Sequence, residues 1–331
     1  TNEEYLLEWK YTNTFHKFTL PRLVGDDKNF DAQAVGCLSP SMKMVEMYYT
    51  ENGLPIDADI TWNYSNRYKL GSESSPEYEG VIPMNTSVVN LHLRREPRFY
   101  ASIAGDRMYW QRGTNTAQDD YNLLVEAHKG EVPWGTQYDF IISNSWQNIN
   151  GYWLKKHLFS WFQTLGYSNN LQGNETAAII RLAEVYLMQS EAWNEYLDQP
   201  DSRVYDPIDK VRERAGILPV REAWGSYSNN PTKVTTKVGM REIIHQEYNI
   251  EFAFEGHRYW NLRRWLIAHQ ILNEKQYGWN VIGTTDQAFY NYETGPVVVW
   301  SSNKFVAPRD YLTPFDAEEI LISGMVQNPQ W

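Results

Sequence analysis

The chain is poor in cysteine, has fewer basic than acidic residues and contains no long apolar run. Only one of its 331 residues is a cysteine, Cys37, which excludes an intrachain disulfide and any metal site built from several cysteines. Lys and Arg number 30 against 41 Asp and Glu, so the net charge is -11 and nucleic-acid phosphates are repelled. Apolar stretches such as 177–180 and 296–300 are far shorter than the roughly 20 residues that cross a bilayer. These absences argue against nucleic-acid binding and against a membrane-spanning helix.

The length predicts about two domains of roughly 150 residues, or one large one. Residues 1–170 are rich in loops, with only short helical or strand-like patterns, and we expect them to form the ligand-binding region. Residues 171–331 form a helical scaffold in this interpretation, and the two parts make one continuous domain. Residue 1 is not Met, and neither a basic leader segment nor a lipid-acceptor cysteine lies near it. We therefore expect that a leader was removed or that the chain is part of a longer one.

Apolar residues at helical spacing predict the helices of the second part. Asn174 or Thr176 can cap the first helix, and Gly216 suits the position just after the end of the second. Asp316, followed three residues later by Glu319, predicts a short last helix that ends near Gly324. The four longer helices are expected at 174–197, 207–215, 238–255 and 257–272, with a loop at 218–236. Two antiparallel helix pairs in sequence indicate hairpins of the tetratricopeptide type, so the fold class is mainly α.

The first part is expected to contribute short elements only. Strand-like patterns occur at 4–11, 98–103 and 151–156. A short helix is expected to begin after Ser41 and to end before Gly53. A loop region of this length is unusual in a compact domain unless it carries function.

Aromatic residues make up 15% of the chain, and many have polar neighbours, as in Trp62-Asn63-Tyr64. Rings in such surroundings suit sugars, whose faces carry C–H groups and whose edges carry hydroxyls. We expect at least two of the four tryptophans in the following set to form an exposed platform, although packing beneath loops is the alternative. The candidate ligand-binding residues are Trp62, Tyr64, Trp110, Trp134, Tyr138 and Trp146.

Three glutamates, Glu247, Glu251 and Glu255, line one face of the third predicted helix. Two carboxylates one turn apart could serve a glycoside hydrolase. A structural ion network with four nearby arginines is the stronger interpretation, and the arginines concerned are Arg241, Arg258, Arg263 and Arg264. No histidine spacing suits a metal, and no phosphate loop or nucleophile motif is present, so we predict no catalytic residue, metal or cofactor.

Several long motifs in the second part resemble the SusD/RagB family. The matching segments are 181–188 (RLAEVYLM) with Glu191-Ala192, 211–216 (VRERAG), 251–265 (EFAFEGHRYWNLRRW), 312–314 (LTP) and 327–329 (QNP). Two shorter patches, 96–99 (EPRF) and 151–156 (GYWLKK), lie where the family has similar ones. The resemblance spans essentially the whole chain but only the C-terminal portion of a family chain.

The resemblance implies a surface lipoprotein of the outer membrane that captures oligosaccharides and passes them to a SusC-type TonB-dependent transporter. It implies a binder rather than an enzyme, with the lipid anchor outside this sequence. Two alternatives stay open, a peptide-binding member of the family and a glycoside hydrolase that uses a carboxylate pair. Because the helices carry apolar residues on more than one side, we also expect an N-terminal segment or a second chain to cover exposed apolar surface.

Overall fold

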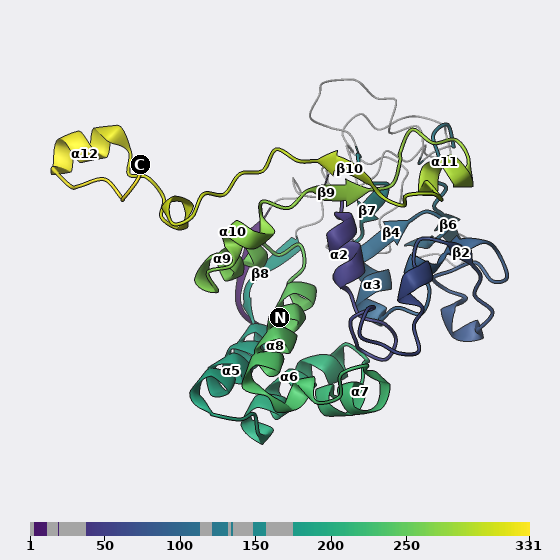
Figure 1. Cartoon of the computed structure of the whole chain (residues 1–331), viewed down its shortest axis with the longest axis horizontal. Helices are drawn as coiled ribbons and strands as arrows, with labels where there is room; N and C mark the ends of the chain where they lie inside the picture. Colours follow the sequence, from purple (N-terminus) through teal and green to yellow (C-terminus); the bar gives the residue numbers. More distant parts are fainter. Residues whose placement is uncertain are drawn as a thin grey trace.

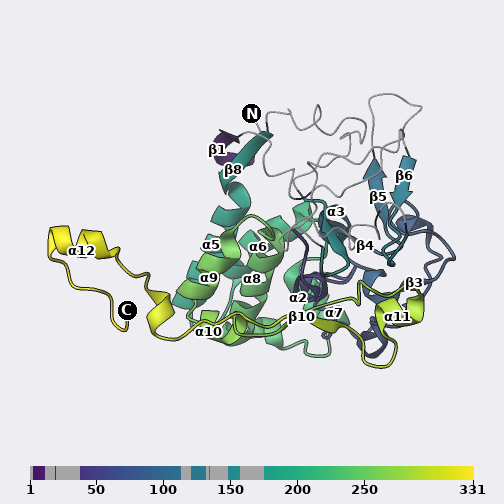
Figure 2. The ribbon, with the colours of Figure 1, turned by 90° about the horizontal axis from the view of Figure 1, so that it is seen from above.

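The computed structural model describes residues 3–11, 19, 38–112, 121–131, 134, 148–156 and 175–331. Two of the candidate residues, Tyr138 and Trp146, lie outside these ranges. Helices of the second part form one side of the molecule, and short strands and helices form the other (Figures 1 and 2). Within the described residues the strands pair in twos, and every pair is antiparallel.

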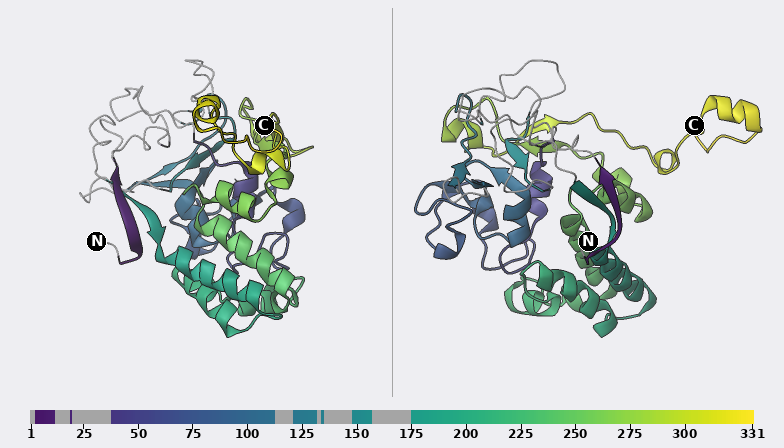
Figure 3. Two further views of the ribbon diagram at one scale, coloured as in Figure 1. Left: turned by 90° about the vertical axis from the view of Figure 1, so that its left-hand side faces the viewer. Right: turned by 180° about the vertical axis from the view of Figure 1, so that it is seen from behind.

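The strand β1 (Tyr5–Tyr11) confirms the strand expected at 4–11 and pairs with β8 (Glu175–Arg181). Tyr5 lies opposite Arg181 and Tyr11 opposite Glu175, so the two strands run side by side above the helices (Figure 3). The prediction of a helix from residue 174 is wrong for its first part, because pairing with β1 holds these residues extended. The helix α5 (Leu182–Tyr196) begins only after the strand.

The helix α6 (Ser202–Arg214) begins five residues earlier than predicted, because the Asp201 side chain caps it by accepting a hydrogen bond from Arg203 N at 2.9 Å. Gly216 follows it with φ of 73°, as expected for the residue after a helix end. The predicted loop at 218–236 is wrong, since it contains α7 (Val220–Tyr227).

The helix α8 (Lys237–Glu251) is capped by Thr236 and packs against α5, and residues of α5, α6 and α8 share one buried cluster (Figure 1). Gly256, with φ of 86°, redirects the chain into α9 (His257–Arg264). The single helix predicted at 257–272 is interrupted at Leu266, where φ is 59°, and continues as α10 (Ala268–Ile271). Helical hairpins of the tetratricopeptide type, as expected, therefore form the scaffold.

On the other side, α2 (Met42–Met47) follows Ser41 as predicted. The strand predicted at 98–103 is wrong, because Pro97 begins the helix α3 (Pro97–Ser102) there. The strand predicted at 151–156 is confirmed by β7. The remaining elements are β2 (Leu70–Gly71) with β3 (Val88–Val89), β4 (Ile103–Gly105) with β7 (Tyr152–Leu154), β5 (Tyr109–Arg112) with β6 (Tyr121–Leu124), β9 (Gln276–Gly278) with β10 (Val297–Trp300), and α11 (Asp286–Tyr290).

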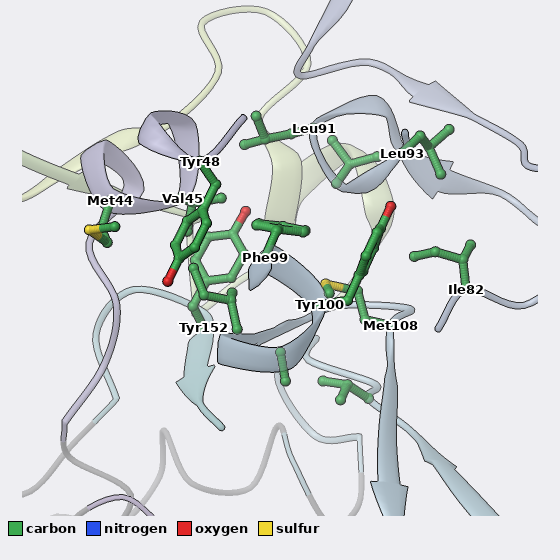
Figure 4. Close-up of a cluster of buried hydrophobic side chains, with 14 of the residues drawn as sticks. Met44, Val45, Tyr48, Ile82, Leu91, Leu93, Phe99, Tyr100, Met108 and Tyr152 are labelled. Carbon is green, nitrogen blue, oxygen red and sulfur yellow. The ribbon is translucent and has the colours of Figure 1, made fainter. Parts of the chain in front are cut away.

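The strand side has its own hydrophobic core, in which α3 lies between α2 and the loops around residue 91 (Figure 4). Phe99 is fully buried and meets Tyr48 edge to face at 5.8 Å. Ile250 and Ala253 from the helical side join the same cluster, whereas a second cluster fills the space between α5, α6 and α8.

Residues up to Tyr311 still contact α9 and α10, whereas the residues after it, which include α12 (Ala317–Ser323), extend away from the body (Figures 1 and 2). The predicted cap is present, since the Asp316 side chain accepts a hydrogen bond from Glu318 N at 2.8 Å, and Gly324 ends the helix with φ of 70°. Leu321, Ile322 and Val326 are more than four-fifths exposed. In the part of the chain that the structure describes, no helix is long and apolar enough to cross a bilayer.

Candidate functional site

An open groove of about 560 Å³ lies between α2, the strand β9 and the turn before β10. This volume falls in the range of small-molecule sites, roughly 300 to 1,000 Å³. Tyrosines, charged groups and a hydroxyl line it together, and the lining residues are Met42, Lys43, Glu46, Tyr68, Glu274, Lys275, Tyr277, Thr294 and Pro296.

Both ends of α2 are fixed, and this fixes Lys43 and Glu46. At the start, the Ser41 hydroxyl accepts a hydrogen bond from Met44 N at 3.3 Å. At the end, the buried guanidinium of Arg95 donates to the carbonyls of Val45 (2.8 Å), Tyr48 (2.6 Å) and Tyr49 (3.1 Å). Val45 lies in the last turn of α2, where a helix leaves its carbonyls without intrahelical partners, and Tyr48 and Tyr49 directly follow the helix. Burial lowers the pKa of Arg95 to about 10, so the side chain stays charged at neutral pH.

The aromatic side of the groove rests on a buried tryptophan. Tyr68 meets Trp279 edge to face, with ring centroids 5.8 Å apart, and Trp279 directly follows β9. Gly295 has φ of 71°, and a Cβ at this position would lie 2.9 Å from the Tyr68 ring. Only glycine therefore suits the turn on both counts. The second ring of the groove, Tyr277, is 42% exposed and available to a ligand.

Hydrogen bonds and ion pairs engage both carboxylates of the groove. Glu46 accepts from Arg67 Nε at 2.8 Å and from the Tyr68 hydroxyl at 2.6 Å, and Glu274 is paired with Lys43. The Arg67 guanidinium also lies over the rings of Tyr64 (4.0 Å) and Tyr68 (4.2 Å), so Tyr64 stands beside the groove. Burial and the hydrogen bond to Glu46 raise the pKa of Tyr68. This hydroxyl therefore stays protonated and donates.

The glutamate ladder of α8 is an ion network, as predicted. Glu247 lies 2.7 Å from Arg98, Glu251 lies 2.5 Å from Arg181, and Glu255 lies 2.8 Å from Arg181. Burial raises the pKa of Glu251, but the arginines outweigh this and hold it at about 2. None of the three glutamates lines the groove, so none is a free carboxylate at its base.

The predicted partners of the ladder are wrong. Arg241 pairs with Glu195, Arg264 pairs with Glu191, Arg263 donates to the carbonyls of residues 310 and 311, and Arg258 contacts Met47. Gly256 turns the chain after α8, and the arginines of α9 therefore reach other groups. The actual partners come from α3, β8, α6 and the segment after β7, and they are Arg98, Arg181, Arg212, Arg214 and Lys156.

The expectation that Trp110 and Trp134 are exposed is wrong. Trp134 is fully buried and Trp110, on β5, is 9% exposed, because the Trp134 ring packs between Trp110 at 5.5 Å and Trp153 at 5.1 Å. Trp62 is half-buried, and its indole N–H donates to the carbonyl of Leu93 at 3.1 Å. Tyr64 is 40% exposed, and of these four it is the one that stands beside the groove.

Tyr68 and Tyr277 were not among the predicted site residues. Tyr277 lies outside the region 1–170 in which the site was expected, and Tyr68 lies inside it but was passed over in favour of Trp62 and Tyr64. The same criterion, a ring among polar neighbours, applies to Lys275-Gln276-Tyr277-Gly278 and would have found it. Within the described ranges no group of three or more His, Cys, Asp or Glu is placed to hold a metal ion.

Comparison with known proteins gives one consistent family. The curated relatives include two proteins of Formosa agariphila: SusD-like protein P25, 32% identical over 117 residues (35% of this chain and 20% of the relative), and SusD-like protein P2, 26% identical over 183 residues (53% and 30%). The chain thus matches less than a third of the length of either. Among solved structures, BT4246 superposes with a TM-score of 0.75 at 25% identity, and it covers all of this chain and 51% of its own.

A SusD-like carbohydrate binding protein of Bacteroides fragilis superposes with a TM-score of 0.61 at 23% identity over 97% of this chain and 54% of its own. The sequence model of the SusD family matches residues 6–331. Because that match covers nearly the whole chain, this chain belongs to the SusD family.

Proposed function

We propose that this chain is the groove-bearing part of a cell-surface protein that captures oligosaccharides and hands them to a SusC-type TonB-dependent transporter of the outer membrane. The single observation that carries the proposal is the groove, in which Tyr277 and Tyr68 stand among charged and hydroxyl groups. A pyranose ring can stack on the exposed Tyr277 while its hydroxyls bond to Glu46, Lys43 or Thr294. Membership of the SusD family supports the same role.

The relatives add support of the same kind. A fold neighbour from Bacteroides fragilis is described as a carbohydrate binding protein. The family resemblance adds three further elements to this proposal. They are the transporter partner, the outer-membrane location, and an N-terminal segment or second chain that covers the exposed apolar residues.

The arrangement of the carboxylates favours binding over hydrolysis. Glycoside hydrolysis needs one carboxylic acid and one free carboxylate on opposite sides of the scissile bond. In the groove, Glu46 is held by Arg67 and Tyr68, and Glu274 is held by Lys43. Stacking on one or two tyrosines contributes roughly 1 kcal/mol per ring, which suits the weak binding that a handover requires.

Binding of an oligosaccharide panel by the full 331-residue chain tests the proposal, by calorimetry and by retardation in affinity gels. We expect retention of at least one glycan and no release of reducing ends. Tyr277→Ala should weaken binding about fivefold, the factor for roughly 1 kcal/mol, with an unchanged Tm. Tyr196→Ala is the matched control, since Tyr196 is 78% exposed on α5 and does not line the groove.

Three results would contradict the proposal. Release of reducing ends by the chain favours the hydrolase. Binding on a peptide array with no glycan retained favours a peptide-binding member of the family. Equal losses in Tyr277→Ala and Tyr196→Ala place the ligand outside the groove.

A further inference from the structure

The groove carries positive charge that the protein itself does not neutralise. Its two lining carboxylates already have cationic partners, Arg67 for Glu46 and Lys43 for Glu274. Lys275 also lines the groove, is exposed and makes no ion pair with any described residue. The Lys275 ammonium is therefore available to a ligand. Lys275 lies two positions before Tyr277 in the sequence.

A second cation flanks the groove from α9. Across the described residues, the one polar contact of Arg258 is with the sulfur of Met47 at 3.9 Å, and Met47 follows the lining residue Glu46 on α2. Burial lowers the pKa of Arg258, and the negative charge of Glu274 opposes this, which places Arg258 within electrostatic reach of the same wall. A guanidinium contacting only a thioether retains its capacity to attract an anion.

The charge balance around the groove is opposite in sign to that of the whole chain. The groove lining itself holds two cations, Lys43 and Lys275, against two carboxylates, Glu46 and Glu274. Arg67 and Arg258, which stand beside the lining, bring the cations to four. Glu293, which precedes the lining residue Thr294 in the sequence and also lies outside the lining, brings the carboxylates to three, so the cations exceed them by one. A chain with a net charge of -11 repels anions in general, so a groove with excess cations is a local exception that favours an anionic ligand.

We propose that the groove selects oligosaccharides that carry an anionic substituent, a uronate carboxylate or a sulfate ester. Tyr277 stacks on a sugar ring, the Lys275 ammonium contacts the anionic group, and Arg258 adds positive potential from the α9 side. This inference rests on the proposed function, since it names the class of glycan that the groove takes. Lysine acts as a point charge and does not distinguish carboxylate from sulfate, so the shared chemistry is the anion.

The test compares matched oligosaccharides of equal length, one neutral, one with uronate residues and one with sulfate esters, by calorimetry at 50 and 300 mM NaCl. We expect the anionic forms to bind roughly tenfold tighter at low salt, as one charge-assisted contact predicts. The advantage should shrink at high salt, where the Debye length is below about 8 Å. Preference for only one of the two anionic forms identifies the anion.

Lys275→Gln should remove most of that advantage and leave binding of the neutral form unchanged. Arg258→Gln should reduce it by a smaller factor. Lys210→Gln and Arg221→Gln are the matched controls, because both side chains are exposed on α6 and α7, outside the groove lining. Neither control should change binding.

Equal binding of neutral and anionic forms overturns this inference and leaves the proposed function intact. Retention of no oligosaccharide of any kind overturns the proposed function itself. Loss of neutral and anionic binding together in Lys275→Gln, with an unchanged Tm, also overturns the inference, because Lys275 then contacts the sugar and not its charge.

Discussion

The indole Nε1 of Trp279 donates a hydrogen bond of 2.9 Å to the hydroxyl of Tyr152, and both side chains are fully buried. The same hydroxyl lies 3.0 Å from Nε2 of His92, whose Nδ1 lies 3.1 Å from the carbonyl oxygen of Asp106. A carbonyl only accepts, so Nδ1 donates and Nε2 accepts from Tyr152. Burial lowers the pKa of His92 to about 3, which keeps the ring neutral and this direction of donors fixed. These linked hydrogen bonds fix the position of Trp279, and the groove residue Tyr68 packs against Trp279.

Tyr152→Phe should destabilise the protein, because the change leaves the Trp279 N–H and the His92 Nε2 buried without partners. Each of the two unsatisfied groups costs about 1 to 3 kcal/mol, so we expect a loss of roughly 2 to 6 kcal/mol in urea denaturation. Tyr292→Phe removes a hydroxyl from a side chain that is 48% exposed and should change stability little. A loss below about 0.5 kcal/mol in Tyr152→Phe would show that the hydrogen-bonded chain contributes nothing net.

Arg95→Met should weaken both stability and ligand binding. The substitution leaves the carbonyls of Val45, Tyr48 and Tyr49 without this donor, so the end of α2 loses its anchor. We expect a loss of about 3 kcal/mol or more in the free energy of unfolding. Calorimetry with the best glycan should show weaker binding in the folded variant, because Lys43 and Glu46 stand on α2. Unchanged affinity would show that the position of α2 does not set the groove.

The secondary structure follows the local sequence pattern only where no segment distant in sequence competes for the backbone hydrogen bonds. Asp316 and Gly324 delimit α12 as predicted, since a cap needs only its own neighbours. Residues 175–181 follow a helical pattern yet form β8, because β1, distant in sequence, supplies the hydrogen bonds. The sequence shows no signal for that pairing.

For the candidate site too, the sequence predicts local patterns but not contacts between distant segments. Glu247, Glu251 and Glu255 were correctly predicted as an ion network from their spacing, but Arg98 and Arg181 were not found as partners because they lie far away in the sequence. Tyr68 and Tyr277 meet in one groove only through the packing of Trp279, and no sequence pattern joins them. The aromatic composition indicated that rings contribute to a site, but it carried no information on which rings or where.

Glu191→Gln should lower stability at neutral pH and have a diminishing effect in acid. Burial raises the pKa of Glu191, but His245 at 3.8 Å and hydrogen bonds from Arg264 and Trp265 outweigh this and hold it at about 2. A carboxyl whose pKa is depressed on folding stabilises the fold above its unfolded pKa, here about 4.5, and this contribution is lost as the pH falls toward 2.

Urea denaturation at pH 7, 5, 4 and 3 measures the effect. The difference between wild type and Glu191→Gln should be constant from pH 7 to 5 and shrink between pH 4.5 and 3. Glu222→Gln, an exposed residue on α7, controls for the loss of a surface charge. A difference that grows in acid would contradict the assigned direction.

Trp134→Ala separates a packing role from a ligand-binding role for the buried tryptophans. Trp134 lies against Trp110 at 5.5 Å and Trp153 at 5.1 Å, and its indole N–H donates to the carbonyl of Leu124 at 3.0 Å. Removing such a ring costs roughly 3 to 5 kcal/mol, which lowers the Tm by roughly 5 to 15 °C. We expect glycan affinity, measured well below the lowered Tm, to stay within about twofold of wild type, because the ring faces other rings and no ligand. Tyr64→Ala should have the opposite effect, an unchanged Tm and weaker binding. Its ring is 40% exposed and stacked with Arg67 beside the groove. If Trp134→Ala instead abolishes binding at an unchanged Tm, the tryptophan faces the ligand and the glycan site lies under β5 and β6.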